Sequence, residues 1–430
     1  MKKYALAALA GLACSAQLAS AQQAPQFTSL GRVDLFDLVV AEINALPNPN
    51  RIGTNPACVA IVGDDLYVAG FNNNLTTLNT PVIKITDALG ARTFSQVPGA
   101  GFSMPAFYGY TGMSYREGSG LLIAYDAYNN EEVGQLRLFD VDSDPTPALL
   151  QESPFGLQGS SGPAWDAGID GLGYSYSVDG SPTTGPVAVS MLFGQVGPFG
   201  LNPSTLDINI GQTVYEFGSP ASNNLRLDFV GISGTTWRDV DVSPADGTFA
   251  ARGNNDLVIG KRGNDNFNFT TQTLVDLGDA PFQAGQNVSI LSNFPGGQVV
   301  IANDRRIGNA GQPFANVVKL YDLDGVELTP TFFNTTALAG FLADGNAWYD
   351  FSYDPRSKRL VVLDFSDYYA YIFIPCPGDT TGDGIIEFDD FLAFFNGFDA
   401  GDDRANVDGI AGVDFGDFLA FFNSFDQGCS

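Results

Sequence analysis

Near the C-terminus, two stretches of twelve residues lie 27 residues apart and are identical at ten positions. They are residues 388–399 (FDDFLAFFNGFD) and residues 415–426 (FGDFLAFFNSFD). In each copy four phenylalanines recur at i, i+3, i+4 and i+7, a spacing that places them on one face of a helix. These phenylalanines are Phe391, Phe394, Phe395 and Phe398 in the first copy, and Phe418, Phe421, Phe422 and Phe425 in the second. Neither short helix can bury such a face alone, so the pattern predicts two helices that pack against each other.

An acidic loop, residues 379–390, leads into the first of these helices. Oxygen-bearing side chains fall at loop positions 1, 3, 5, 9 and 12, namely Asp379, Thr381, Asp383, Glu387 and Asp390. Gly384 at position 6 permits a sharp turn, and Ile385 at position 7 would contribute its backbone carbonyl. Calcium takes six to eight oxygen ligands from a loop of this kind. The spacing therefore predicts a calcium site.

The 27-residue offset places a second loop at residues 406–417. It keeps oxygen side chains at positions 1, 3, 9 and 12, which are Asn406, Asp408, Asp414 and Asp417. Position 5 is Ile410, which offers no side-chain ligand, and position 6 is Ala411, whose Cβ resists a left-handed backbone. The second loop is therefore expected to bind calcium more weakly than the first.

Duplicated loop–helix units with Asp at position 12 resemble dockerin modules. The cysteines that bracket the segment, Cys376 and Cys429, make it similar to the GC-type dockerins in particular. The resemblance covers residues 376–430 and implies Ca²⁺ as the bound ion and calcium-dependent attachment to a cohesin-like or surface protein. A calcium-stabilised cap that binds no partner is the alternative.

Charge and composition exclude several classes of function. The chain has 20 basic and 48 acidic residues, and residues 376–430 alone hold twelve acidic residues and one basic residue, Arg404. Nucleic acid and anionic membrane surfaces would repel such a protein. The chain has no histidine, which excludes Ser-His-Asp and Cys-His catalysis and imidazole metal sites.

Residues 1–21 read as a secretory signal peptide, with Lys2 and Lys3 before a short apolar stretch and small residues at positions 19–21. The protein is thus expected to be secreted, extracellular or at the cell surface, without membrane insertion. Lipidation of Cys14 is the alternative form of export. Export permits disulfides. Cys376 and Cys429 flank the acidic segment and are expected to pair, whereas Cys58, in an apolar strand, is expected to be a buried free thiol.

Residues 22–375 repeat a simple β unit, in which a short apolar strand, a polar turn and a second apolar strand recur six times. The second strands begin near residues 66, 121, 172, 248, 298 and 359, and a third strand often follows. This pattern predicts a mainly β domain, a β-propeller of six blades, or of seven if Phe27–Val40 helps to close the ring. The long gap between the third and fourth repeats is interpreted as a loop insertion at Asp179–Gly234. A pair of β-sandwiches is the alternative fold.

The expected protein is a secreted propeller, residues 22–375, with a binding or structural role, attached through the calcium-binding α-helical module of residues 376–430. The alternative is an extracellular hydrolase or lyase that acts on polysaccharide. Its acid and base would come from carboxylates near the blade loops: Asp166, Asp170, Asp239, Asp241 or Asp304. Strand-terminating and turn-forming roles explain the same residues without catalysis. No catalytic residue is therefore predicted.

Overall fold

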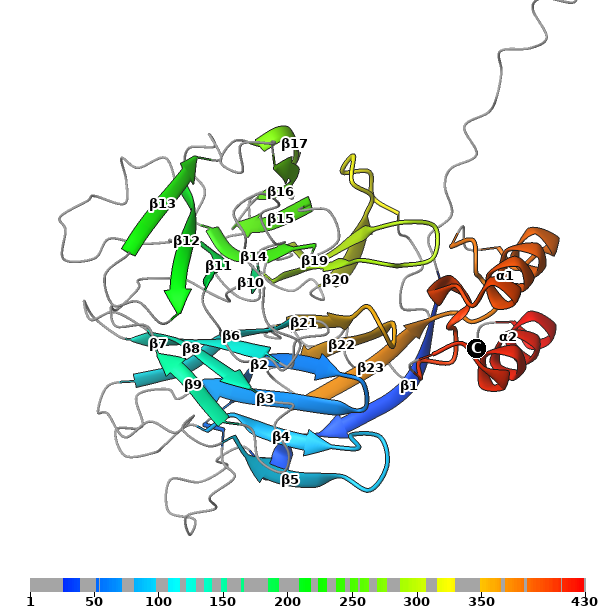
Figure 1. Ribbon diagram of the computed structural model, residues 1–430, viewed down its shortest axis with the longest axis horizontal. Coiled ribbons are helices and arrows are strands. Elements are labelled where there is room, and N and C mark those ends of the chain that lie inside the picture. The colour runs from blue at the N-terminus through cyan, green and yellow to red at the C-terminus, as the bar shows by residue number, and fades with distance from the viewer. Residues whose placement is uncertain are drawn as a thin grey trace, which may run out of the picture.

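The computed structural model of the protein is mainly β and ends in two helices (Figure 1). The residues that it describes are 26–38, 52–53, 55–71, 81–97, 107–116, 121–128, 135–140, 148–152, 164–165, 185–192, 209–217, 223–229, 237–243, 248–253, 256–262, 269–276, 287–306, 315–328, 349–364, 368–382, 385–410 and 412–428. Residues 26–375 are called the β part below, and the residues from Cys376 onward the C-terminal module. The signal peptide and Cys14 lie outside the described residues.

The β part consists of antiparallel units in which consecutive strands pair with each other. The first unit holds β2 (Asn55–Val62), β3 (Asp65–Phe71), β4 (Ile83–Thr86) and β5 (Thr93–Gln96). The second holds β6 (Phe107–Arg116), β7 (Leu121–Tyr128), β8 (Gln135–Asp140) and β9 (Ala148–Glu152). A single pair, Phe71 with Gly109, joins these two units into one sheet of eight strands.

Two further units have four strands each. The third holds β10 (Ala164–Trp165), β11 (Gly185–Leu192), β12 (Asn209–Phe217) and β13 (Asn223–Phe229). The fourth holds β14 (Trp237–Val242), β15 (Thr248–Gly253), β16 (Asp256–Arg262) and β17 (Phe269–Asp276). The loop insertion expected at Asp179–Gly234 is wrong, because this segment contains β11, β12 and β13. In β12, Gly211 and Gln212 stand side by side and interrupt the alternation that marks a strand.

The last two units lie beside the C-terminal module. The fifth holds β18 (Val288–Leu291), β19 (Val299–Arg306) and β20 (Ala315–Tyr321). The sixth holds β21 (Tyr349–Asp354), β22 (Arg359–Asp364) and β23 (Tyr369–Pro375). Its fourth strand comes from the N-terminal end, since β1 (Phe27–Asp34) pairs antiparallel with β23. The segment Phe27–Val40, which was considered as part of a seventh blade, therefore supplies β1 to the sixth unit. A short 3-10 helix, η1 (Phe36–Leu38), follows β1.

The apolar core lies between neighbouring units, and β22 shows why. Its six residues are all buried, and successive side chains of a strand point to opposite faces. Leu360 and Val362 pack in the cluster shared with β18–β20, while Val361 and Leu363 pack in the cluster shared with β2–β4. A nearly continuous apolar strand is therefore buried on both of its faces.

The first strands of the six units contact one another in chain order. β2 contacts β6, β6 contacts β10, β10 contacts β14, β14 contacts β18, β18 contacts β21, and β21 contacts β2.

The C-terminal module holds α1 (Phe388–Ala400), a 3-10 helix η3 (Asp403–Ala405) and α2 (Phe415–Gln427). The two predicted helices are confirmed, and their aromatic faces meet. The rings of Phe394 and Phe421 stack in parallel with centroids 4.2 Å apart, and both side chains are buried. The module lies beside β1 and β23 at one end of the molecule (Figure 1). Among the described residues, neither α-helix has the length and apolar character needed to cross a membrane.

Candidate metal centre in the C-terminal module

The first loop, residues 379–390, is held to its helix by Asp390. This side chain is fully buried. Its Oδ1 accepts hydrogen bonds from the backbone N–H of Thr381 at 2.8 Å and from the Thr381 hydroxyl at 2.9 Å. Its Oδ2 accepts from the N–H of Glu387 at 2.9 Å, as part of a capping box at the start of α1. The structure thus brings positions 3, 9 and 12 of the predicted loop together.

The other predicted ligands of the first loop differ in their exposure to solvent. Asp379 at position 1 is buried, whereas Ile385 and Glu387 at positions 7 and 9 are exposed. Asp383 at position 5 lies outside the described residues.

The second loop, residues 406–417, repeats this arrangement around Asp417. Oδ1 of Asp417 accepts from the N–H groups of Val407 at 2.6 Å and Asp408 at 3.1 Å, and Oδ2 accepts from the N–H of Asp414 at 2.8 Å. Asp414 and Asp417 form a capping box at the start of α2. An Asp at position 12 therefore fixes the entry into the helix in both repeats, a role that the ligand spacing does not predict.

The second loop offers a set of oxygen atoms suited to a hard cation. Carboxylate oxygens of Asp408, Asp414 and Asp417 lie within 4.8 Å of one another. Asn406 at position 1 is buried, and its Oδ1 has no hydrogen-bond partner. Burial raises the pKa of Asp408, and the charges of Asp417 and Asp414 raise it further. Oxygen ligands alone are the set that calcium prefers, so these residues fit the predicted ion.

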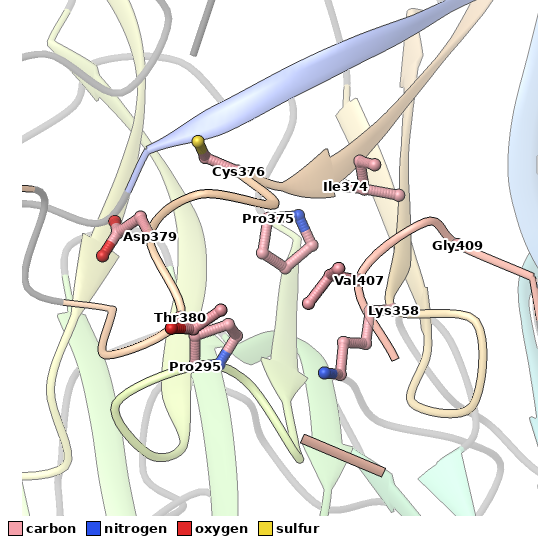
Figure 2. A pocket seen from close by; sticks show the side chains of 9 residues that line it. All are labelled: Pro295, Lys358, Ile374, Pro375, Cys376, Asp379, Thr380, Val407 and Gly409. Carbon is pink, nitrogen blue, oxygen red and sulfur yellow. The ribbon is translucent and has the colours of Figure 1, made fainter. Parts of the chain in front are cut away.

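Both loops face the β part, and a small pocket lies at this seam (Figure 2). From the β part, its lining includes Pro295, Lys358 and Ile374. From the module, it includes Thr380 of the first loop and Val407 and Gly409 of the second.

Lys358 is the one charged side chain that the β part contributes to this pocket. It is only 3% exposed, and its Nζ donates a hydrogen bond to the carbonyl of Arg404 at 3.1 Å. Burial lowers the pKa of Lys358 to about 8, against the charges of Asp417, Asp403 and Asp402, which favour the ammonium form. No motif in the sequence indicated this residue, although Arg356, Lys358 and Arg359 form a basic cluster in an acidic chain.

Three carboxylates of the β part, among them the candidate Asp241, accept hydrogen bonds from backbone N–H groups. Oδ2 of Asp241 accepts from the N–H of Ile290 at 2.7 Å and from the Ser289 hydroxyl at 2.8 Å. Asp350 and Asp354 on β21 accept at 2.8 Å from the N–H groups of Val59 and Gly63.

These bonds join the first strands of adjacent units. Ser352, between the two aspartates, accepts from the N–H of Ile61 at 3.1 Å. Burial raises the pKa of Asp350 to about 7, although the donated hydrogen bonds oppose this shift. Of the other candidates, Asp239 and Asp304 lie on β14 and β19, while Asp166 and Asp170 lie outside the described residues.

The cysteines agree with expectation where the structure describes them. Cys58 is a buried free thiol whose pKa is raised by burial. Cys376 is disulfide-bonded and 2% exposed, and its Sγ lies 3.3 Å from the hydroxyl oxygen of Ser424 on α2. Cys429, its predicted partner, lies outside the described residues.

The outer surface of the module carries apolar side chains in matched positions of the two repeats. Phe388 and Phe415 are 65% and 67% exposed, and Leu392 and Leu419 are 43% and 48% exposed. Each exposed phenylalanine stacks on the next aromatic ring of its helix, Phe391 or Phe418.

Comparisons with known proteins do not assign the chain to a family. No family model and no curated protein matches it. Among solved structures, the crystal structure of Chaetomium thermophilum Raptor is similar over 82% of this chain, with 11% identity and a TM-score of 0.39. The chain spans 30% of the length of that protein.

Proposed function

We propose that this protein is exported and that its C-terminal module attaches the β part to a partner when it binds calcium, in the manner of a dockerin. The observation that carries the proposal is the second loop, in which three carboxylates converge within 4.8 Å and Asn406 has a buried Oδ1 with no hydrogen-bond partner. A calcium ion would supply the charge that these groups lack. The matched loop of the first repeat supports the same role.

The exposed apolar residues of the two helices suit attachment. Phe388, Leu392, Phe415 and Leu419 are exposed, and their apolar area would be buried against a partner protein. The partner that we propose is a cohesin-like or surface protein, and the β part has a binding or structural role.

We further propose that the β part is a six-bladed propeller. The proposal is supported by six antiparallel units whose first strands contact one another in sequence, with β21 next to β2. It is also supported by the pairing of β1 with β23, which joins the two ends of the β part within one unit. Removing residues 22–34 should then destabilise the whole β part, whereas an open array of sheets would lose only the sixth unit.

The functional proposal is tested by calcium binding and calcium-dependent capture. Calorimetry on residues 22–430 should show bound calcium, and the same protein immobilised should capture a partner from the native secretome in calcium but not in chelator. The double variant Asp383→Ala/Asp408→Ala should lose both properties, whereas Lys319→Gln, on β20, should keep them. A protein that binds no calcium, or that captures the same partner in chelator, would contradict the proposal.

A further inference from the structure

The C-terminal module is joined to the β part without a linker. β23 ends at Pro375, and Cys376 follows it as the first residue of the module. The N–H of Cys376 donates to the carbonyl of Gln26, the residue before β1, at 2.9 Å. The module is therefore held at the place where the two ends of the β part meet.

Both loops of the module contact the β part, and each does so through its position 4. Gly382 of the first loop and Gly409 of the second have φ +73° and +77°. A Cβ on Gly382 would overlap the carbonyl of Pro295, in the turn between β18 and β19. A Cβ on Gly409 would lie 3.1 Å from Cγ2 of Ile374, on β23. Position 4 of each loop thus lies too close to the β part to admit a side chain without strain.

Position 1 of each loop makes a polar contact with the β part, and the residue type suits the group that it meets. Asp379 of the first loop accepts a hydrogen bond from the N–H of Gln26 at 3.4 Å. Asn406 of the second loop meets a carbonyl instead, and its Nδ2 donates to the oxygen of Arg356 at 3.1 Å. A carboxylate could not make this second bond, because it has no hydrogen to donate. An amide at position 1 of the second loop is therefore matched to the β part.

The other polar atom of Asn406 remains for a ligand. The side chain is 3% exposed, and its Oδ1 is buried and has no hydrogen-bond partner within the described part of the chain. A buried carbonyl oxygen without a partner is unfavourable. The next two residues, Val407 and Asp408, donate their N–H groups to Asp417, which is one of the converging carboxylates. Loop spacing makes Asn406 the position-1 ligand, so Oδ1 is the atom that it can offer to calcium.

The turn between β21 and β22, which receives Asn406, is itself anchored. Asp354 accepts from the N–H of Arg356 at 3.1 Å and from the N–H of Gly63, in the first unit, at 2.8 Å. Nζ of Lys358, in the same turn, donates to the carbonyl of Arg404 at 3.1 Å and adds a second bond to the module. A change in the second loop therefore acts on a turn that links the sixth unit to the first.

We propose that the module docks on the β part through its two loops, and that Asn406 couples calcium in the second loop to this docking, with Nδ2 on the Arg356 carbonyl and Oδ1 on the ion. The inference rests on the proposed calcium binding and adds its consequence for the β part. A cation on Oδ1 polarises the amide and so strengthens the hydrogen bond that Nδ2 donates. Because coupling is reciprocal, docking raises the calcium affinity of the second loop by the same factor. Both loops then face the chain's own β part, and a partner protein would contact α1 and α2 (Figure 1).

Hydrogen exchange and calcium calorimetry on residues 22–430 test the coupling. In the unmodified protein, calcium should slow exchange of the turn residues 354–359 about tenfold relative to chelator. In Asn406→Asp the new carboxylate can still bind the ion, but it repels the Arg356 carbonyl instead of donating to it. Calorimetry should therefore still detect the weaker calcium site, while calcium no longer slows exchange of this turn.

Two matched variants guard this comparison. Asn423→Asp makes the same substitution at an exposed position of α2 and should behave as the unmodified protein does. If Asn406→Asp does not fold, Asn406→Ser replaces it, because serine keeps an oxygen for the ion but is one atom too short for the Arg356 carbonyl. Asn423→Ser is then the control.

The docking is tested separately, in chelator. Gly382→Ala should speed exchange of residues 292–297 several-fold, because its Cβ would overlap the Pro295 carbonyl. Gly401→Ala is the matched control: this glycine has φ +65°, and its Cβ would meet no atom within 4 Å. It adds a similar backbone strain away from the β part and should leave exchange of residues 292–297 unchanged.

The outcomes separate this inference from the proposed function. If calcium binds but slows exchange of residues 354–359 equally in Asn406→Asp and in the unmodified protein, or in neither, the coupling is wrong while the proposed function stands. If the unmodified protein binds no calcium, the proposed function fails and the coupling fails with it. Equal exchange of residues 292–297 in Gly382→Ala and Gly401→Ala would refute docking through the loops, whatever calcium does.

Discussion

The two repeats of the C-terminal module share their helices but differ in their loops. α1 and α2 are 13 residues long, each begins with a capping box, and each contributes one stacked ring to the centre of the module. Both helices fill the same small interior, so a change in one must be matched by the other. This shared core accounts for the four phenylalanines that recur in both helices, whereas the identical pairs Phe388/Phe415 and Leu392/Leu419 are exposed and lie outside it.

The loops have no such shared interior, because each contacts a different segment of the β part. The first loop lies against the turn around Pro295, and Thr381 adds its hydroxyl to the bonds on Asp390. The second loop lies against the turn that carries Lys358, where Asn406 Nδ2 donates to the Arg356 carbonyl, and three of its backbone N–H groups donate to Asp417. A duplicated sequence can therefore keep a symmetric core and still acquire two distinct binding loops.

The largest loss of stability should come from substitutions in the shared core of the two helices. Phe394→Ala and Phe421→Ala each remove a buried ring from the stacked pair, and each should destabilise the module by about 3–5 kcal/mol. The two losses should be equal within about 1 kcal/mol if the repeats contribute equally. Loss of helical circular dichroism in urea measures this, because α1 and α2 are the α-helices of the described residues. Phe388→Ala, at an exposed ring, is the control.

Removing the aspartate at position 12 of either loop should cause a smaller loss of stability, and the loss should differ between the two loops. Asp417→Ala leaves three backbone N–H groups without their acceptor, and Asp390→Ala leaves two together with the Thr381 hydroxyl. An unsatisfied buried donor is costly, so we expect losses of about 3 kcal/mol for Asp417→Ala and about 2 kcal/mol for Asp390→Ala. Urea unfolding in chelator excludes any contribution from calcium. A larger loss for Asp390→Ala would show that the hydroxyl outweighs the third N–H group.

Calcium affinity should depend more on the first loop than on the second, which reverses the order expected for stability. Asp383→Ala removes a carboxylate from the loop with the fuller ligand set and should weaken the dominant site about a hundredfold, which corresponds to about 2.7 kcal/mol. Asp408→Ala should change the dominant site less than threefold. Calorimetry on residues 22–430 measures both variants. Two sites of equal affinity in the unmodified protein would contradict this ranking.

The sequence predicted those elements whose pattern is local. The i, i+3, i+4, i+7 spacing identified α1 and α2, and short polar turns between apolar runs identified hairpins such as β2–β3 and β21–β22. The strands β11–β13 were missed. Gly211 and Gln212 interrupt the alternation of β12, whereas β13 alternates apolar and polar residues from Leu225 to Phe229, a signal that was overlooked. The pairing of β1 with β23 joins segments more than 330 residues apart, and no local pattern encodes it.

The candidate site was predictable only in part, for a similar reason. Loop spacing named the oxygen ligands, since a calcium loop draws them from one short segment. It did not reveal that Asp390 and Asp417 also hold backbone N–H groups, or that Lys358 of the β part donates a hydrogen bond to the Arg404 carbonyl of the module. Whether a carboxylate binds an ion, an N–H group or a lysine depends on neighbours that folding brings near.

The smallest effect on stability should come from the exposed phenylalanines, and this tests whether the two helices are alike outside the core as well as within it. Phe388→Ser and Phe415→Ser alter rings that are about two-thirds exposed, so each should change the free energy of unfolding by less than about 0.5 kcal/mol. Calcium affinity should not change, because neither side chain is a proposed ligand. Capture of the partner in calcium should nevertheless fall for one or both variants, since these rings offer the apolar area that attachment would bury. Equal losses would mean that the partner contacts both repeats, whereas a loss for one variant alone would identify the helix that binds. Full capture by the double variant would show that the partner binds elsewhere on the molecule.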